Sequence, residues 1–208
     1  MERRSQWGTY MEGGVQAFQN GRYDEAEKLF GAALKEVDEP GSHDLRLAMS
    51  LNTLAELYAA RGELEKAEPM LKRSLEIREK ALGANHPDVA ATLNSLAEMY
   101  RTKERYAEAE PLFKRAIAID EKALGTGHPG YATDLTNLAM LYAMQEKFAE
   151  AEPLLQRALA IMERIFGRDH PNNILVLANL SQVYRVRGKY VDADELDARL
   201  DRIKSQYA

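Results

Sequence analysis

The amino-acid sequence repeats itself with a period of 42 residues. Three His-Pro pairs keep this spacing, at residues 86–87, 128–129 and 170–171. Three Ala-Glu-Pro triplets keep it as well, at residues 67–69, 109–111 and 151–153. A tyrosine recurs in the same register at positions 58, 100, 142 and 184. Such periods are typical of arrays in which each unit buries its apolar surface only against its neighbours.

Within one period the apolar residues have the spacing of a helix. A first stripe stands at i, i+3, i+4 and i+7, and therefore on one helix face: Leu51, Leu54, Ala55 and Tyr58. A second stripe follows in the same unit: Ala67, Leu71 and Ser74. Each period therefore predicts two helices joined by a turn, with arms of about 14 and 17 residues.

Proline and glycine indicate where these helices begin and end. Prolines are expected in the first turn of each first helix, where the missing N–H costs least: Pro87, Pro129 and Pro171. For the same reason a second set is expected close to the start of each second helix: Pro69, Pro111 and Pro153. Glycines are expected just after the second helices: Gly83, Gly125 and Gly167. Pairs such as Glu68 and Lys72, spaced i, i+4, predict ion pairs on a solvated outer face.

The two ends of the chain depart from the repeat. Pro40-Gly41-Ser42 replaces the His-Pro connector, and His43 lies next to that slot. Three glycines are expected to weaken the first helix by up to about 1 kcal/mol each: Gly8, Gly13 and Gly14. At the other end, Asp197 stands where earlier units have an apolar residue. A more polar last helix is expected of a cap that has only one neighbour.

Composition excludes several classes of protein. The formal net charge is −5, from 28 basic and 33 acidic residues, which disfavours a nucleic-acid partner. No cysteine is present, so disulfide scaffolds and thiolate chemistry are excluded. No apolar run is long enough for a membrane span, and no apolar stretch follows the charged start. We therefore expect a cytoplasmic protein, although a leader removed beforehand would leave no trace in the chain.

Residues with catalytic or metal-binding potential do not converge in the sequence. His86, His128 and His170 each occupy one connector, which favours capping and packing of the turn over a shared metal ion. No nucleophile elbow or phosphate-binding loop occurs. Glu56 and Glu98 recur one repeat apart, which is long for a shared proton. We expect no catalytic residue, no metal site and no cofactor, and hence no enzyme.

The residue pattern carries a family resemblance. Leu51-x2-Leu54-Ala55-x2-Tyr58, followed by Ala67-x3-Leu71, resembles the tetratricopeptide repeat, whose standard unit is shorter. The longer unit, with its Ala-Glu-Pro triplet and its Glu-Lys-Ala-Leu-Gly-x-x-His-Pro connector, resembles the repeat of kinesin light chains and bacterial relatives. The likeness is strong over residues 44–195 and weak over 5–40. It implies an all-α fold: a right-handed α-solenoid of about five helix-turn-helix repeats with a C-terminal capping helix.

We expect one array over residues 1–208, with repeats at about 5–42, 43–85, 86–127, 128–169 and 170–208. In the family the first helices line the concave side, so their residues outside the packing stripe are expected to form a groove. The predicted groove residues are Asn52, Glu56, Asn94, Ser95, Glu98, Arg101, Thr136, Asn137, Met140, Met144, Asn179, Gln182 and Arg185.

Each residue type in this groove has a chemical reason to bind a protein segment. Carboxamides both donate to and accept from a peptide backbone. Arg101 and Arg185 could hold carboxylates, and Met140 and Met144 offer an adaptable apolar patch. The asparagines could equally fix neighbouring helices, and the sequence leaves both interpretations open. The two lysine slots that chaperone adaptors use hold no lysine here, which disfavours that branch.

These features predict a non-catalytic scaffold or adaptor that binds a peptide or protein segment of unknown identity in the concave groove. One alternative is a self-associating module that acts as a structural subunit. An alternative from another class is a small-ligand sensor or an enzyme regulatory domain. We expect a monomer or a weak homodimer.

Overall fold

The computed structural model describes residues 6–39 and 44–207, and every regular element in these ranges is helical. The predicted boundary at residues 42 and 43, with Pro40-Gly41-Ser42 and His43, lies outside them. The helices are α1 (Gln6–Gln19), α2 (Tyr23–Lys35), α3 (Leu45–Ala60), α4 (Leu64–Leu82), α5 (Pro87–Thr102), α6 (Tyr106–Ala123), α7 (Pro129–Met144), α8 (Phe148–Phe166), the 3-10 turn η1 (Pro171–Asn173), α9 (Ile174–Val186) and α10 (Tyr190–Tyr207). The predicted all-α class is confirmed.

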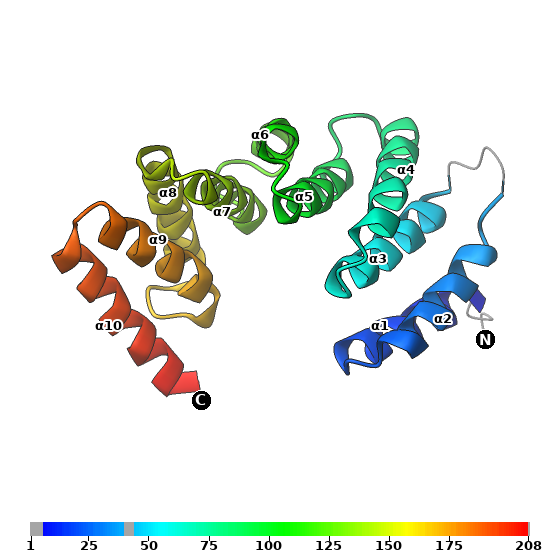
Figure 1. Ribbon diagram of the computed structural model, residues 1–208, viewed down its shortest axis with the longest axis horizontal. Coiled ribbons are helices and arrows are strands. Elements are labelled where there is room, and N and C mark those ends of the chain that lie inside the picture. The colour runs from blue at the N-terminus through cyan, green and yellow to red at the C-terminus, as the bar shows by residue number, and fades with distance from the viewer. Residues whose placement is uncertain (1–5, 40–43, 208) are drawn as a thin grey trace. The chain divides into compact units, whose positions relative to one another are not determined.

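The chain divides into two compact units, residues 1–104 and 105–208. Unit 1 holds α1–α5 and unit 2 holds α6–α10. Inside each unit, every helix packs against the next one along the chain (Figure 1). The two first helices α3 and α5 also contact each other in unit 1, as do α7 and α9 in unit 2. Four of the predicted helix-turn-helix pairs therefore pack within the units, α1–α2, α3–α4, α7–α8 and α9–α10, and first helices of neighbouring repeats contact each other within each unit.

The predicted apolar stripes form the cores of both units. In unit 1, Leu51, Leu54 and Ala55 are buried, and so are Leu71 and Ser74 on the second helix. In unit 2, residues from α7 to α10 form one apolar cluster that includes Leu135, Leu155, Leu177 and Leu200. Because these positions recur with the repeat, one pattern of side chains builds each core.

Histidine and proline together start three of the first helices. His86 Nδ1 accepts a hydrogen bond from the Asp88 backbone N–H at 3.1 Å, and His128 accepts from Gly130 at 3.1 Å. His170 accepts from Asn172 at 3.2 Å, at the start of η1. Each imidazole thus satisfies a backbone donor that the first turn leaves without a partner. The predicted capping role of these histidines is confirmed.

The turn between the two helices of a repeat needs a left-handed backbone. Gly62 and Gly188 supply it with φ of 76° and 75°. Glu104 and Glu146 adopt the same conformation with φ of 57° and 60°, at a steric cost that glycine avoids.

The expected position of the second set of prolines was wrong. Pro69, like its two equivalents, lies inside its helix, five residues after the first residue, Leu64. Proline has no N–H group, so the backbone carbonyl one turn earlier receives no hydrogen bond from it. Because Pro69 is exposed, water can solvate that carbonyl.

The recurrent tyrosine and the glutamate of Ala-Glu-Pro join successive repeats. The Tyr100 hydroxyl donates to Glu68 at 3.1 Å, from α5 to α4, and the Tyr142 hydroxyl donates to Glu110 at 3.2 Å, from α7 to α6. Tyr58 makes the corresponding bond to Glu27 at 2.8 Å. Glu68 pairs with Lys72 as predicted, but only 15% of its side chain is exposed. The expectation of a solvated outer-face pair therefore missed the inter-repeat bond.

Acid should weaken the hydrogen bond between Tyr100 and Glu68 that joins two repeats. The hydrogen bonds from Lys72, Lys103 and Tyr100 lower the pKa of Glu68 from 4.5 to about 2, against the opposing effect of burial. The resulting stabilisation is complete above about pH 4.5 and is lost as the pH falls towards 2. We expect Glu68→Gln to reduce the loss of unfolding free energy between pH 6 and pH 3 in urea titrations. Glu150→Gln removes an exposed carboxylate that is not part of these tyrosine–glutamate bonds, and it should leave that loss unchanged.

One glycine of the first helix is required by packing. A Cβ atom on Gly14 would lie 2.4 Å from a ring carbon of Phe30, which is completely buried. The same atom on Gly13 would lie 3.4 Å from Leu29. The propensity cost expected of Gly14 is therefore accompanied by a packing role, because its small size lets α1 approach α2.

Alanine at these two adjacent positions should have opposite effects. We expect Gly14→Ala to destabilise the protein by about 1–3 kcal/mol, because the clash outweighs the gain in helix propensity. Gly13→Ala should leave stability unchanged or raise it by up to about 1 kcal/mol. Thermal unfolding of the two variants measures the difference, and equal melting temperatures would show that α1 and α2 are not packed this closely.

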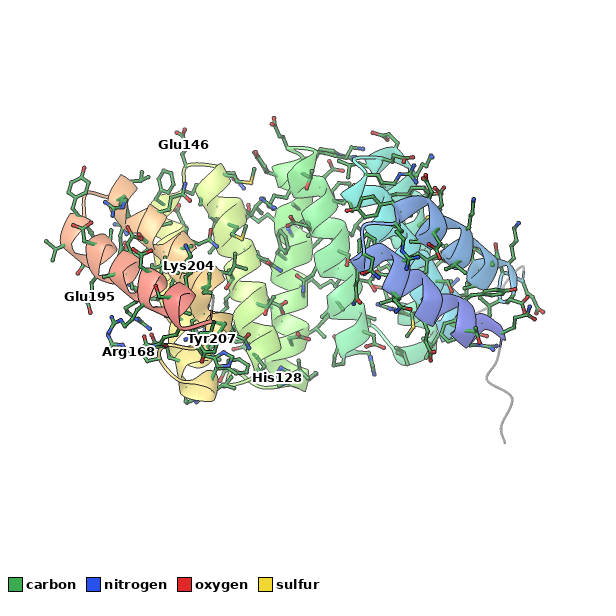
Figure 2. The ribbon with its side chains drawn as sticks, turned by 90° about the horizontal axis from the view of Figure 1, so that it is seen from below. His128, Glu146, Arg168, Glu195, Lys204 and Tyr207 are labelled. Atoms are coloured by element: carbon green, nitrogen blue, oxygen red, sulfur yellow. The ribbon has the colours of Figure 1, made fainter. Side chains whose placement is uncertain are left out.

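The C-terminal helix is anchored by a buried arginine. Arg199 of α10 is 4% exposed and donates to Glu163 of α8 at 2.6 Å and to the Arg168 carbonyl at 2.7 Å. The neighbouring pair of Arg168 and Glu195 lies on the surface at 3.5 Å (Figure 2). The exposed face of α10 is mostly polar, as predicted for a cap, with Asp192, Glu195, Asp201 and others.

Unit 2 also contains a buried pair of carboxyl groups. Asp120 of α6 is 7% exposed and is hydrogen-bonded to Asp134 of α7, which is 2% exposed. Burial raises the pKa of Asp120, while Asp134 and His128 oppose this effect. Two adjoining buried carboxyl groups disfavour each other's ionised form.

Candidate functional site

The face of unit 1 that carries its first helices is hollowed at two places. The first hollow lies between α1 and α3 and has a volume of about 510 Å³. We call it the Met49 hollow; its lining residues are Met11, Glu12, Val15, Gln16, Gln19, Met49 and Thr53. Met49 is 46% exposed and Val15 is 39% exposed, so apolar surface is open to a partner.

The second hollow lies where α3, α4 and α5 meet and has a volume of about 210 Å³. We call it the Glu56 hollow; its lining residues are Ala55, Glu56, Ala59, Leu64, Leu71, Ser95, Glu98, Met99 and Thr102. Its walls are mainly apolar, and its two carboxylates come from α3 and α5. The structure thus brings three predicted groove residues of neighbouring repeats, Glu56, Ser95 and Glu98, to one cavity.

The two glutamates of this hollow differ in their partners. Glu98 forms an ion pair with Arg101, three residues along its own helix, with a 2.8 Å bond from Arg101 Nε. Glu56 accepts a 2.6 Å hydrogen bond from the Asn52 amide on Oε1. Burial raises the pKa of Glu56. The positive charge of Arg78 and the hydrogen bond from Asn52 oppose this effect. Among the described residues no cationic side chain forms an ion pair with Glu56.

The other predicted groove residues are placed as follows. Asn94, Asn137 and Met140 are half-buried on their first helices, and Met144 and Gln182 are exposed. Asn179 donates to the Leu175 carbonyl of its own helix at 2.8 Å. Arg185 donates to Asp194 of α10 at 2.8 Å and also pairs with Asp197. Both predicted arginines are thus engaged in ion pairs within their own units.

One predicted groove residue was wrong. Thr136 is 1% exposed and donates to the Ala132 carbonyl of its own helix at 2.8 Å, so it belongs to the interior of unit 2. It shares its slot in the repeat with Asn52 and Asn94, which are half-buried. A short hydroxyl can bond back to the helix where a carboxamide reaches outwards.

Sequence reasoning missed the apolar residues that create the hollows, chiefly Met49, Ala59 and Leu64. A signal for the second hollow was present in the repeat register. The slot of Ala59 holds Arg101 one period later, and the slot of Leu64 holds Tyr106 and then Phe148. In unit 2 the Phe148 ring packs against the apolar core. Leu64 is smaller than Phe148 and leaves that volume empty in unit 1, whereas Ala59 recurs as Ala143 in unit 2.

Comparison with known families agrees with the repeat pattern. Overlapping stretches of the chain match the tetratricopeptide repeat family at residues 13–80, 46–122, 88–164 and 131–199. The chain belongs to the tetratricopeptide repeat family. The tetratricopeptide likeness inferred from the Leu-x2-Leu-Ala-x2-Tyr pattern is thereby confirmed. A search of the curated proteins found no match to the chain.

Solved tetratricopeptide structures match the whole chain. Kinesin light chain nearly identical TPR-like repeats from Podosopora anserina are 26% identical, with a TM-score of 0.79 over 100% of this chain and 99% of that one. BtubC (BKLC) from P. vanneervenii is 25% identical, with a TM-score of 0.82 over 93% of this chain and 78% of that one. The predicted kinesin-light-chain-like character is confirmed.

A more distant structure shares the fold alone. A Rap protein complexed with competence and sporulation factor is 16% identical, with a TM-score of 0.80 over 97% of this chain and 55% of that one. Within the described residues, none of the helices combines the length and the apolar character that crossing a bilayer requires.

Proposed function

We propose that the protein is a non-catalytic scaffold that binds an extended segment of a partner protein on the face formed by α1, α3 and α5. The observation that supports this proposal is the pair of adjoining hollows along α3. The Met49 hollow offers exposed apolar side chains, and the Glu56 hollow offers apolar walls with polar groups at its rim. Binding faces commonly combine apolar surface with a few polar groups that fix orientation.

The half-buried carboxamides extend the same face. Asn52 on α3 and Asn94 on α5 occupy one slot in successive repeats, and the Oδ1 atom of each is buried, which leaves the amide N–H groups for a bound segment. Amides of this kind can pair with the backbone of an extended segment. The Rap protein that shares this fold was solved in complex with competence and sporulation factor, which supports the proposal. We further propose that unit 2 carries binding residues of its own, the exposed Met144 and Gln182.

A library of random 12-residue peptides, displayed on phage and selected against the intact protein, tests this proposal. We expect Met49→Glu to weaken the selected peptides about tenfold or more in fluorescence anisotropy titrations, because it puts a charge in an apolar contact. Val191→Glu changes an equally apolar residue, 83% exposed on α10, and should have no effect. The proposal fails if the peptides bind Met49→Glu as well as the wild type, or if only Val191→Glu weakens them.

A further inference from the structure

We propose that the Glu56 hollow is a specific subsite for a lysine side chain of the bound segment. This inference rests on the proposed function and adds the chemistry of the partner. The apolar walls would surround the aliphatic stem of the lysine, and the Glu56 carboxylate at the rim would receive its ammonium group. A long cationic side chain commonly buries its stem in this way while the charged end stays near water.

The carboxylate geometry favours a lysine over an arginine. Asn52 occupies Glu56 Oε1, so Oε2 is the oxygen left for a ligand. An arginine fork gains most from a carboxylate that offers both oxygens, whereas an ammonium group acts as a compact point charge. One remaining oxygen therefore matches an ammonium group better than a guanidinium group.

Of the two carboxylates that line the hollow, Glu56 is the one that has no ion-pair partner among the described residues. Arg101 is already paired with Glu98, three residues away on the same helix. Arg78 acts on Glu56 only through its field, because its guanidinium donates to the Asp88 carbonyl at 3.0 Å and to the Thr92 hydroxyl at 2.6 Å. A ligand ammonium group would thus complete an ion pair that the described residues do not supply.

The walls of the hollow explain why unit 1 carries this subsite. The repeat slots of Glu56 and Glu98 continue as Met140 and Gln182, so the carboxylate is absent from the later first helices. In unit 2 the slot of Leu64 is taken by Phe148, whose ring belongs to the core. Cavity and charge therefore coincide at Glu56.

The test uses the same random 12-residue peptide library. We expect the selected peptides to be enriched in lysine at a fixed distance from an apolar residue. Replacing that lysine with norleucine keeps the stem and removes the charge, and it should weaken binding to the wild-type protein about tenfold. Glu56→Gln should weaken the lysine peptide by a similar factor and leave the norleucine peptide unchanged. Glu150→Gln, with the same change in net charge, should weaken neither peptide.

Two outcomes separate this inference from the proposed function. If Met49→Glu weakens the selected peptides but neither norleucine nor Glu56→Gln does, the lysine subsite is overturned and the proposed function stands. If Met49→Glu has no effect, the proposed function fails and takes the subsite with it. Ala59→Leu adds a check that does not involve charge, because filling the hollow should weaken the lysine and the norleucine peptides alike.

Discussion

Arg199→Ala should destabilise the protein by about 2–4 kcal/mol. Breaking a buried ion pair typically costs about 3–5 kcal/mol, because the remaining partner is left without compensation. Here the loss is smaller, since the Glu163 side chain remains 28% exposed and can be hydrated. The Arg168 carbonyl also loses a donor, so the connection between α10 and the segment before η1 is removed. Urea unfolding at neutral pH measures the effect.

Matched variants show whether charge or packing is responsible. Arg199→Met keeps most of the stem and should cost less than Arg199→Ala. Arg157→Ala, in the same slot one repeat earlier, removes an arginine whose side chain is 50% exposed, and it should cost no more than about 1 kcal/mol. Equal losses for Arg157→Ala and Arg199→Ala would contradict the burial of Arg199.

Replacing both buried aspartates with apolar residues should stabilise the protein. The slots of Asp120 and Asp134 hold Met162 and Val176 in the next repeat, so this fold already accommodates that pair. We expect Asp120→Met with Asp134→Val to raise the unfolding free energy at pH 7 by about 1–4 kcal/mol, as found when buried charged groups are replaced by packed apolar ones.

The pH dependence of this gain gives a sharper test. Burial raises the pKa of Asp120 above its value in the unfolded chain, so the folded state retains a proton that the unfolded state releases. The native pair is therefore most favourable at low pH and is penalised as the pH rises. The gain from the double substitution should be larger at pH 7 than at pH 4 in guanidinium titrations. A gain that does not change with pH would contradict the raised pKa of Asp120.

The repeat made the fold predictable, because one register fixes what each position contacts in every unit. Leu51, Leu54 and Ala55 are buried as their spacing predicts, and His86 caps its helix. Contacts between repeats follow the same register, yet Tyr100 and Glu68 are far apart in sequence, and i, i+4 reasoning assigned Glu68 to a different surface. A recurrent arginine at positions 73, 115, 157 and 199 was likewise visible in the sequence.

The candidate site was less predictable because it depends on departures from the repeat. The Glu56 hollow exists where Leu64 is smaller than its counterparts Tyr106 and Phe148, and Gly14 faces Phe30 in a slot that holds alanine in the next repeats. Arg199 is buried where it contacts Glu163 and the connector residues Arg168 and Asp169, whereas its counterpart Arg157 is half exposed. Helical spacing identifies the face on which a residue lies, but the volume left beside it depends on all its neighbours.

The methionines allow a direct measurement of where a partner binds. Met11, Met49 and Met99 line the two hollows, whereas Met70 and Met162, on second helices, line neither of them. With 13C-labelled methionine methyl groups, we predict that a library-selected peptide shifts the NMR signals of Met11, Met49 and Met99 and leaves those of Met70 and Met162 in place. Shifts confined to Met70 and Met162 would contradict binding on the face formed by α1, α3 and α5.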